Sequence, residues 1–281
     1  MVLLDHGADV HKTIDTGRNC IHLAAFNGGK EVCEILLDNG CELLSQDKDG
    51  WSSLHLAAQE GHLETVQLFL DHGADVEVRS NDGRTPLHLA CLKGRTEVVQ
   101  HLISAGALCD VVDHSNWSPL IDASNGGFLE LVKILLNHQV RINIQTNGKQ
   151  ETALHHAAYN GHNEVAVYLV ERGANCSITD HAGNTPFHVA VAKGDIKVVQ
   201  AMVQIGEASI YDRNKNGESP LKLACAAGHL EVVAYLLHKG AVLNNMVEDG
   251  QAALEIARSK GHNEIVCLLI NSGCLDGWYV G

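Results

Sequence analysis

Large aromatic side chains and long apolar runs are both scarce in this chain. Phe, Trp and Tyr account for 4% of its 281 residues, although hydrophobic residues account for 45%. This composition favours thin helical layers joined by Ala, Leu and Val over a core built on large rings. No stretch approaches the roughly 20 consecutive apolar residues that a membrane-spanning helix needs. The sequence therefore predicts no membrane insertion.

Signals for secretion are also missing. The segment from Met1 to Gly7 has neither a basic end nor the long apolar stretch of a signal peptide. The 9 cysteines are odd in number and include no Cys-x-x-Cys pair, so neither a disulfide framework nor a zinc site is indicated. We therefore expect free thiols in a reducing compartment, and an intracellular protein of the cytoplasm, the nucleus or both.

The motifs of the common catalytic sites are absent as well. The chain has no phosphate loop of the Gly-x-x-x-x-Gly-Lys-Ser/Thr type, no Gly-x-Gly-x-x-Gly and no Gly-x-Ser-x-Gly elbow. Its Ser, His and Asp residues are instead scattered in the rhythm of a repeat. We therefore predict that the protein is not an enzyme and has no catalytic residue, no metal site and no cofactor.

Basic residues are outnumbered. The chain carries 34 acidic residues against 20 Lys and Arg, which gives a net charge of −14. The Lys and Arg residues are dispersed, so a phosphate backbone would be repelled, and we expect no direct binding of nucleic acid. A protein partner with a basic or mixed-charge segment fits this charge, as does the simpler interpretation that the acidic residues only solvate the surface.

The chain does contain a repeat. The segment from Trp51 to Gly61 has a close counterpart in the segment from Arg84 to Gly94, and related segments recur at intervals of 33 or 34 residues. The apolar residues that mark these segments are Ile21, Leu54, Leu87, Leu120, Leu154, Phe187, Leu221 and Leu254. A period of this length is typical of a solenoid, in which similar units stack one on the next.

One period contains the signals for two short helices. Thr85 is a suitable N-cap and precedes a Pro, which is tolerated at the first helical position. Gly94 ends this helix, and a second one runs from about Thr96 to Gly106 with apolar residues along one side. Two such helices cannot bury both apolar faces by themselves, whereas stacked hairpins form a continuous core.

These segments resemble the ankyrin repeat, whose pattern contains Thr-Pro-Leu-His, Gly-His and Gly-Ala-Asp. Close copies of its parts are Thr85-Pro86-Leu87-His88, Thr185-Pro186-Phe187-His188, Gly61-His62, Gly161-His162, Gly228-His229, Gly261-His262, Gly7-Ala8-Asp9 and Gly73-Ala74-Asp75. The resemblance implies an all-α ankyrin-repeat solenoid of helix-turn-helix hairpins with short β-turn finger loops. We expect a partial N-terminal repeat over residues 1–13, eight repeats in one solenoid domain over residues 14–274, and a C-terminal tail over residues 275–281.

The 18 histidines invite the hypothesis of a metal protein. Five of them occupy one repeat position, where the ankyrin family uses the imidazole to tie its own turn to the neighbouring repeat: His22, His55, His88, His155 and His188. Equivalent positions on stacked helices are about 8–10 Å apart, whereas the ligands of one zinc ion all lie about 2 Å from the metal. We therefore predict that this histidine ladder is structural.

The resemblance also implies a protein-binding groove, lined by the turn tips and the exposed ends of the first helices. Large residues at these positions predict a groove from Ile21 to about Tyr159, with Trp51 and Trp117 as anchors and Arg18, Arg84 and Lys93 as polar contacts. The predicted binding residues are Arg18, Phe26, Trp51, Gln59, Glu60, Arg84, Leu92, Lys93, Trp117, Asn125, Glu151 and Tyr159. Glu60, Glu151 and Glu218 would give this groove negative charge. The alternative is that each Trp only covers the turn of its neighbour.

The function implied is that of a monomeric, non-catalytic scaffold or adaptor for a protein partner. One alternative is the targeting module of a larger enzyme, or an adaptor of a ubiquitin ligase, phosphatase or kinase, whose other domain is missing from this chain. Another alternative is a structural spacer.

Two single residues carry separate expectations. Asn143 matches the position at which ankyrin repeats can be hydroxylated, and Asn244 is the other full match. Asp122 stands where other repeats have an apolar residue, and we expect it to form a hydrogen bond with an adjacent turn or to face a partner.

Overall fold

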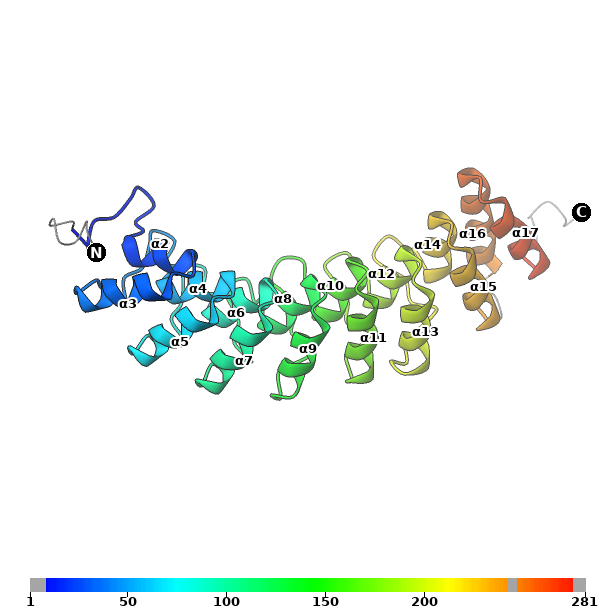
Figure 1. The fold of residues 1–281 in the computed structure, drawn as a ribbon. Coiled ribbons are helices and arrows are strands. Elements are labelled where there is room, and N and C mark those ends of the chain that lie inside the picture. Colours follow the sequence, from blue (N-terminus) through cyan, green and yellow to red (C-terminus); the bar gives the residue numbers. More distant parts are fainter. Residues whose placement is uncertain (1–8, 242–246, 275–281) are drawn as a thin grey trace, which may run out of the picture. The chain divides into compact units, whose positions relative to one another are not determined.

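Sixteen helices and no strand are present in the computed structural model, which describes residues 9–241 and 247–274 (Figure 1). The helices come in hairpins joined by short turns. An isolated antiparallel bridge between Gln46 and Ser52 closes one of these turns. The expected all-α class is therefore confirmed.

The chain divides into two units, Met1–Ile144 and Gln145–Gly281, which we call unit 1 and unit 2. The first helices of the hairpins in unit 1 are α2 (Cys20–Phe26), α4 (Ser53–Glu60), α6 (Pro86–Leu92) and α8 (Pro119–Gly126). Their second helices are α3 (Lys30–Asp38), α5 (Leu63–Asp71), α7 (Thr96–Ser104) and α9 (Leu129–Leu136).

Unit 2 repeats the same plan. Its first helices are α10 (Ala153–Tyr159), α12 (Pro186–Lys193), α14 (Pro220–Ala227) and α16 (Val247–Lys260). Its second helices are α11 (Asn163–Glu171), α13 (Ile196–Gln204), α15 (Leu230–His238) and α17 (Asn263–Asn271).

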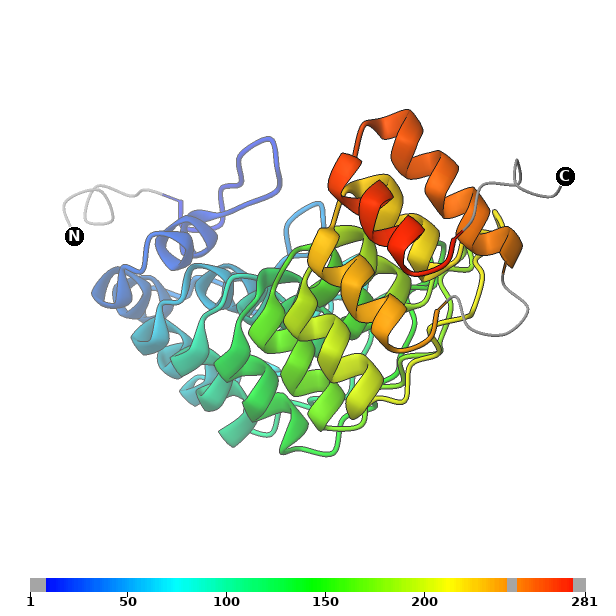
Figure 2. The ribbon, with the colours of Figure 1, turned by 90° about the vertical axis from the view of Figure 1, so that its right-hand side faces the viewer.

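Each unit has two layers of helices. Within unit 1, α2, α4, α6 and α8 pack in succession, and so do α3, α5, α7 and α9; unit 2 follows the same rule (Figure 2). The apolar residues that mark the repeat lie in the core, at 0–1% exposure: Ile21, Leu54, Leu87, Leu120, Leu154, Phe187, Leu221 and Leu254. The expected core between stacked hairpins is present in each unit.

Helix boundaries follow the local signals. Thr85 is the N-cap of α6, and the imidazole of His88 accepts a hydrogen bond from the Thr85 backbone N–H at 3.2 Å. The glycines that end the helices of this hairpin, Gly94 and Gly106, have φ of 72° and 98°. Glycine adopts this left-handed conformation without the steric cost of a side chain.

The last hairpin departs from the pattern because α16 has 14 residues, whereas the first helix before it has 8. Asp249, in the added part, is 1% exposed and forms ion pairs through Oδ1 with Arg213 Nη2 at 3.0 Å and Lys222 Nζ at 3.1 Å. Lys222 stands at the repeat position where other hairpins carry the ladder histidine. An ion pair therefore replaces the imidazole at this end of unit 2.

The expected domain boundaries remain predictions. Most of the partial first repeat, Asn244 and the whole C-terminal tail lie outside the described residues.

Candidate protein-binding surface

The five ladder histidines hold successive repeats together. In each, Nε2 lies 3.0–3.2 Å from a backbone carbonyl oxygen in the following turn. The accepting residues are Trp51 for His22, Arg84 for His55, Trp117 for His88, Asn184 for His155 and Asp212 for His188. The predicted structural role of this ladder is confirmed.

Burial fixes the charge of these rings, and the carbonyl partner fixes their tautomer. It lowers the pKa of His55 and of His88 to about 4, so both imidazoles are neutral at pH 7. The carbonyl oxygen can only accept, so Nε2 carries the proton and Nδ1 is free to accept from the N-cap backbone. In the part of the chain that the structure describes, no group of three His, Cys, Asp or Glu side chains could hold a metal ion.

A second set of hydrogen bonds between successive repeats was not predicted from the sequence. His62 Nε2 donates to the Phe26 carbonyl at 3.0 Å, and His229 Nε2 donates to the Ala192 carbonyl at 2.9 Å. Arg95 does the same with its Nε for Gln59, at 3.0 Å. Each of these hydrogen bonds provides a donor for a backbone carbonyl in the last turn of the first helix of the preceding hairpin. The sequence signal for these hydrogen bonds was the Gly-His pair, which follows the first helix in several repeats.

In unit 1, the residue after the positive-φ position of a turn, Gly50 or Asn116, helps to hold that turn. The Trp51 ring stacks on His55 with 6.4 Å between centroids, and the Trp51 backbone N–H donates to Asp47 Oδ1 at 2.8 Å. Trp117 likewise donates its backbone N–H to Asp113, at 2.9 Å. Both Trp side chains are half-buried. These residues support the turns and remain partly exposed.

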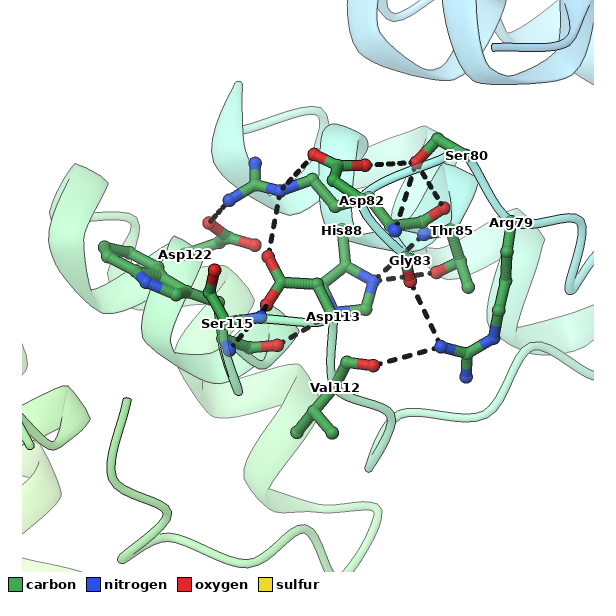
Figure 3. Close-up of polar contacts among 12 residues, drawn as sticks. Arg79, Ser80, Asp82, Gly83, Thr85, His88, Val112, Asp113, Ser115 and Asp122 are labelled. Atoms are coloured by element: carbon green, nitrogen blue, oxygen red, sulfur yellow. Dashed lines mark hydrogen bonds and ion pairs between the residues drawn. The ribbon is translucent and has the colours of Figure 1, made fainter. Parts of the chain in front are cut away.

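Arg18 and Arg84 form ion pairs inside the repeat stack. Arg18 Nε lies 2.9 Å from Asp47 Oδ2, and Arg84 Nε lies 3.2 Å from Asp113 Oδ2. Figure 3 shows the second pair, with Asp82 and Asp122 beside it. Because these guanidinium groups already have carboxylate partners, they are less available as polar contacts than the sequence suggested.

Asp122 is buried in the same cluster. Its side chain is 0% exposed, and its nearest cation is the Nη2 of Arg84, at 3.7 Å. Neither carboxylate oxygen forms a hydrogen bond within the described structure, so the expected bond with an adjacent turn is wrong. Burial raises its pKa to about 7, against the smaller opposite effect of Arg84.

The position at the end of the first helix is more open. Phe26 is 42% exposed and Tyr159 is 60% exposed. Lys93 is also exposed, whereas the remaining predicted residues at these helix ends are half-buried: Gln59, Glu60, Leu92 and Asn125. Glu60 lies 3.8 Å from Arg95. These residues gather on the first-helix ends of unit 1, except for Tyr159, which belongs with Glu151 to unit 2.

Unit 2 contains a cavity that was not predicted from the sequence. Its volume is about 330 Å³, and its lining includes Glu151, Tyr159, Asp180, Lys193 and Glu218. The Lys193 ammonium lies over the Tyr159 ring, 4.3 Å from the centroid. We call this the acidic cavity. The sequence had favoured the earlier repeats because the later ones carry small or polar residues at the groove positions.

The remaining observations concern modification and membranes. Asn143 is exposed, and its hydroxylation stays a prediction.

Among the described helices, none has both the length and the apolar character needed to cross a membrane.

The fold, the histidine ladder and the motif spacing agree with a comparison to known families. The family model described as "Ankyrin repeats (3 copies)" matches residues 1–80, 21–113, 76–146, 97–180, 120–213 and 187–276. The chain belongs to the ankyrin-repeat family.

Curated proteins with sequences similar to this chain have names that describe different roles. The chain is 30% identical over 122 residues to the probable 26S proteasome regulatory subunit p28 of Saccharomyces cerevisiae, covering 43% of this chain and 54% of that protein. It is 32% identical over 121 residues to the NF-kappa-B inhibitor alpha of Gallus gallus, covering 41% of this chain and 38% of that protein. The match to alpha-latrocrustotoxin-Lt1a of Latrodectus tredecimguttatus is 31% identical over 116 residues, which are 41% of this chain and 8% of the toxin.

A solved structure resembles the chain over a longer stretch. The ankyrin repeat domain of human ASB11 superposes with a TM-score of 0.71 at 29% identity, covering 79% of this chain and 98% of that domain. The curated relatives named above match over about half of their length or less, so their own activities do not transfer to this chain.

Proposed function

We propose that this protein is a non-catalytic scaffold or adaptor that binds a protein partner on the first-helix ends and turn tips of its ankyrin repeats. The observation that carries the proposal is the exposure of aromatic rings at one repeat position, 42% for Phe26 and 60% for Tyr159. Neither ring is needed to fill the core at that position. Aromatic residues dominate the binding energy of protein interfaces, which supports a recognition role.

The partner that fits best carries a basic or mixed-charge segment, since the chain has a net charge of −14. We place the protein as a monomer in the cytoplasm or the nucleus. Two similar proteins are named as an inhibitor of NF-kappa-B and as a proteasome regulatory subunit, and both names describe action on another protein. That supports binding as the general role without naming a partner.

The test is an affinity pull-down with mass spectrometry from cytosolic and nuclear extracts. The wild-type chain is compared with two double variants, Phe26→Ala with Tyr159→Ala and Trp51→Ala with Trp117→Ala. The matched control is Leu108→Ala, because Leu108 is 60% exposed and lies in the loop after a second helix. Circular dichroism and urea unfolding first establish that every variant is folded.

We expect a set of proteins that the wild type and Leu108→Ala retain and that at least one aromatic double variant loses. Partner sets that are the same for all variants would place binding elsewhere and refute the proposed surface. An empty set for the wild type would refute the scaffold itself and favour a spacer, or a module whose activity depends on another domain.

A further inference from the structure

Two of the turns in unit 1 follow a charge rule that the sequence repeat alone does not state. In these two, the arginine after the turn glycine supplies a cation to the aspartate 29 positions later, in the next turn, whereas the equivalent Trp51 and Trp117 carry no charge. Arg18 does so for Asp47 at 2.9 Å, and Arg84 does so for Asp113 at 3.2 Å. Each aspartate also accepts the backbone N–H that closes its own turn. The carboxylate thus holds the turn, and the arginine neutralises it.

Unit 2 breaks this rule at the corresponding pair. Asp180 closes its turn in the same way, by accepting the Asn184 backbone N–H at 2.8 Å. The residue 29 positions before Asp180 is Glu151, and both line the acidic cavity. Two carboxylates therefore occupy the places that an arginine and an aspartate occupy in unit 1. Burial raises the pKa of Glu151, Lys149 lowers it, and the charge of Asp180 raises it again.

Apart from Lys193, no Lys or Arg in the lining of the cavity can compensate these charges. Across the described residues of unit 2, no Lys or Arg lies within 4.0 Å of the carboxylates of Glu151, Asp180 or Glu218. The histidine nearest to Glu151 is His156, at 3.5 Å, and burial lowers its pKa to about 4, so it is neutral at pH 7. Burial also lowers the pKa of the two ladder histidines in the lining. The single cation of the lining, Lys193, sits over the Tyr159 ring.

We propose that the acidic cavity receives an arginine side chain from an extended segment of the protein partner. Its guanidinium would lie between Glu151 and Asp180 and neutralise them, as the intramolecular arginine neutralises the aspartate in unit 1. Arginine fits better than lysine because its planar group binds carboxylates through two hydrogen bonds and stacks on aromatic rings such as Tyr159. This inference rests on the proposed function, since it supplies one contact of the partner with the first-helix ends.

The test uses the full chain to select binders from a library of random short peptides. Selected peptides are then measured by fluorescence anisotropy, each with its arginine replaced by lysine or by neutral citrulline. Glu151→Arg restores the charge rule of unit 1 and fills the cavity from within. Glu171→Arg is the matched control, because Glu171 is exposed at the end of α11 and is not part of the cavity lining. Lys193→Gln removes the resident cation.

We expect selected peptides to share an arginine at one position, and citrulline at that position to weaken binding at least about tenfold. Glu151→Arg should weaken binding similarly, Glu171→Arg should leave it unchanged, and Lys193→Gln should strengthen it. Peptides without an arginine preference, or an arginine preference that survives Glu151→Arg, would overturn the arginine site. So would the absence of any selected peptide.

The scaffold proposal is judged separately by the pull-down. Partners lost from the aromatic double variants would sustain it even if the arginine site failed.

Discussion

Replacing Asp122 by Asn should make the protein more stable at neutral pH. The Asp122 side chain is 0% exposed, and its two oxygens form no hydrogen bond within the described structure. The same repeat position holds the buried Leu56 and Leu89 in the preceding hairpins. Burial raises the pKa of Asp122 although Arg84 lies 3.7 Å away. The loss of hydration of the carboxylate is therefore larger than its attraction to Arg84.

The magnitude follows from the pKa. Folding raises it from the ordinary value of 3.8 to about 7, so the folded chain holds this proton more tightly than the unfolded chain does. The free energy of unfolding therefore falls as pH rises between about 4 and 7, at about 1.4 kcal/mol per pH unit. Ionising Asp122 costs the folded state about 4 kcal/mol at pH 7 and about 2 kcal/mol at pH 5. Asn has nearly the same shape and does not ionise.

Urea unfolding followed by circular dichroism measures this effect. The unfolding free energy of Asp122→Asn minus that of the wild type should grow by about 2 kcal/mol between about pH 5 and pH 7. Taking this difference cancels the titration of the histidines, which both proteins share. The control is Asp71→Asn, an exposed aspartate at the end of α5, whose difference from the wild type should stay flat.

A difference that is constant with pH would show that Asp122 titrates in the folded protein as it does in the unfolded chain. A difference that shrinks as pH rises would show that the ion pair with Arg84 outweighs desolvation. Either result refutes the reasoning.

Three further changes test the ladder, the close approach of neighbouring repeats and the last hairpin. His88→Ala should cost about 2–4 kcal/mol at pH 7, because a fully buried ring and its hydrogen bonds are lost. In urea unfolding at pH 5, this cost should be about 2 kcal/mol smaller. Folding lowers the pKa of His88 from 6.5 to about 4, so the unfolding free energy of the wild type itself falls in acid. A cost independent of pH would contradict this. Gly194→Ala should cost at least about 1 kcal/mol more than Gly173→Ala. Both glycines have positive φ, but a Cβ at Gly194 would clash with the His229 ring, whereas nothing lies within 4 Å of one at Gly173; equal thermal unfolding midpoints would argue against the close approach. Asp249→Ala should cost about 3 kcal/mol, because the Lys and Arg that pair with it lose their partner, and amide hydrogen exchange in α17 should accelerate; unchanged exchange would mean that this ion-pair cluster does not hold the last hairpin.

Much of the fold could be predicted from the sequence because ankyrin hairpins are specified by local signals. The N-cap at Thr85 and the apolar residue Leu87 act within a few residues of chain, and the same pattern recurs along the chain. The ladder was predictable for the same reason: His88 recurs with the period of the repeat. A signal repeated in this way is recognised even where one copy is changed, as at Lys222.

The site was harder to predict because its charges meet only after the repeats stack. Arg84 looked like a free surface cation, whereas stacking places it beside Asp113, 29 residues away. The same stacking places Glu151 with Asp180 around a cavity, in repeats whose groove positions looked unpromising. By itself the sequence determined the period, the helical hairpins and the core position, since these depend on neighbours along the chain. Only the tertiary structure decided which charges are neutralised by an ion pair inside the protein and which are not, because that depends on distances between turns of different repeats.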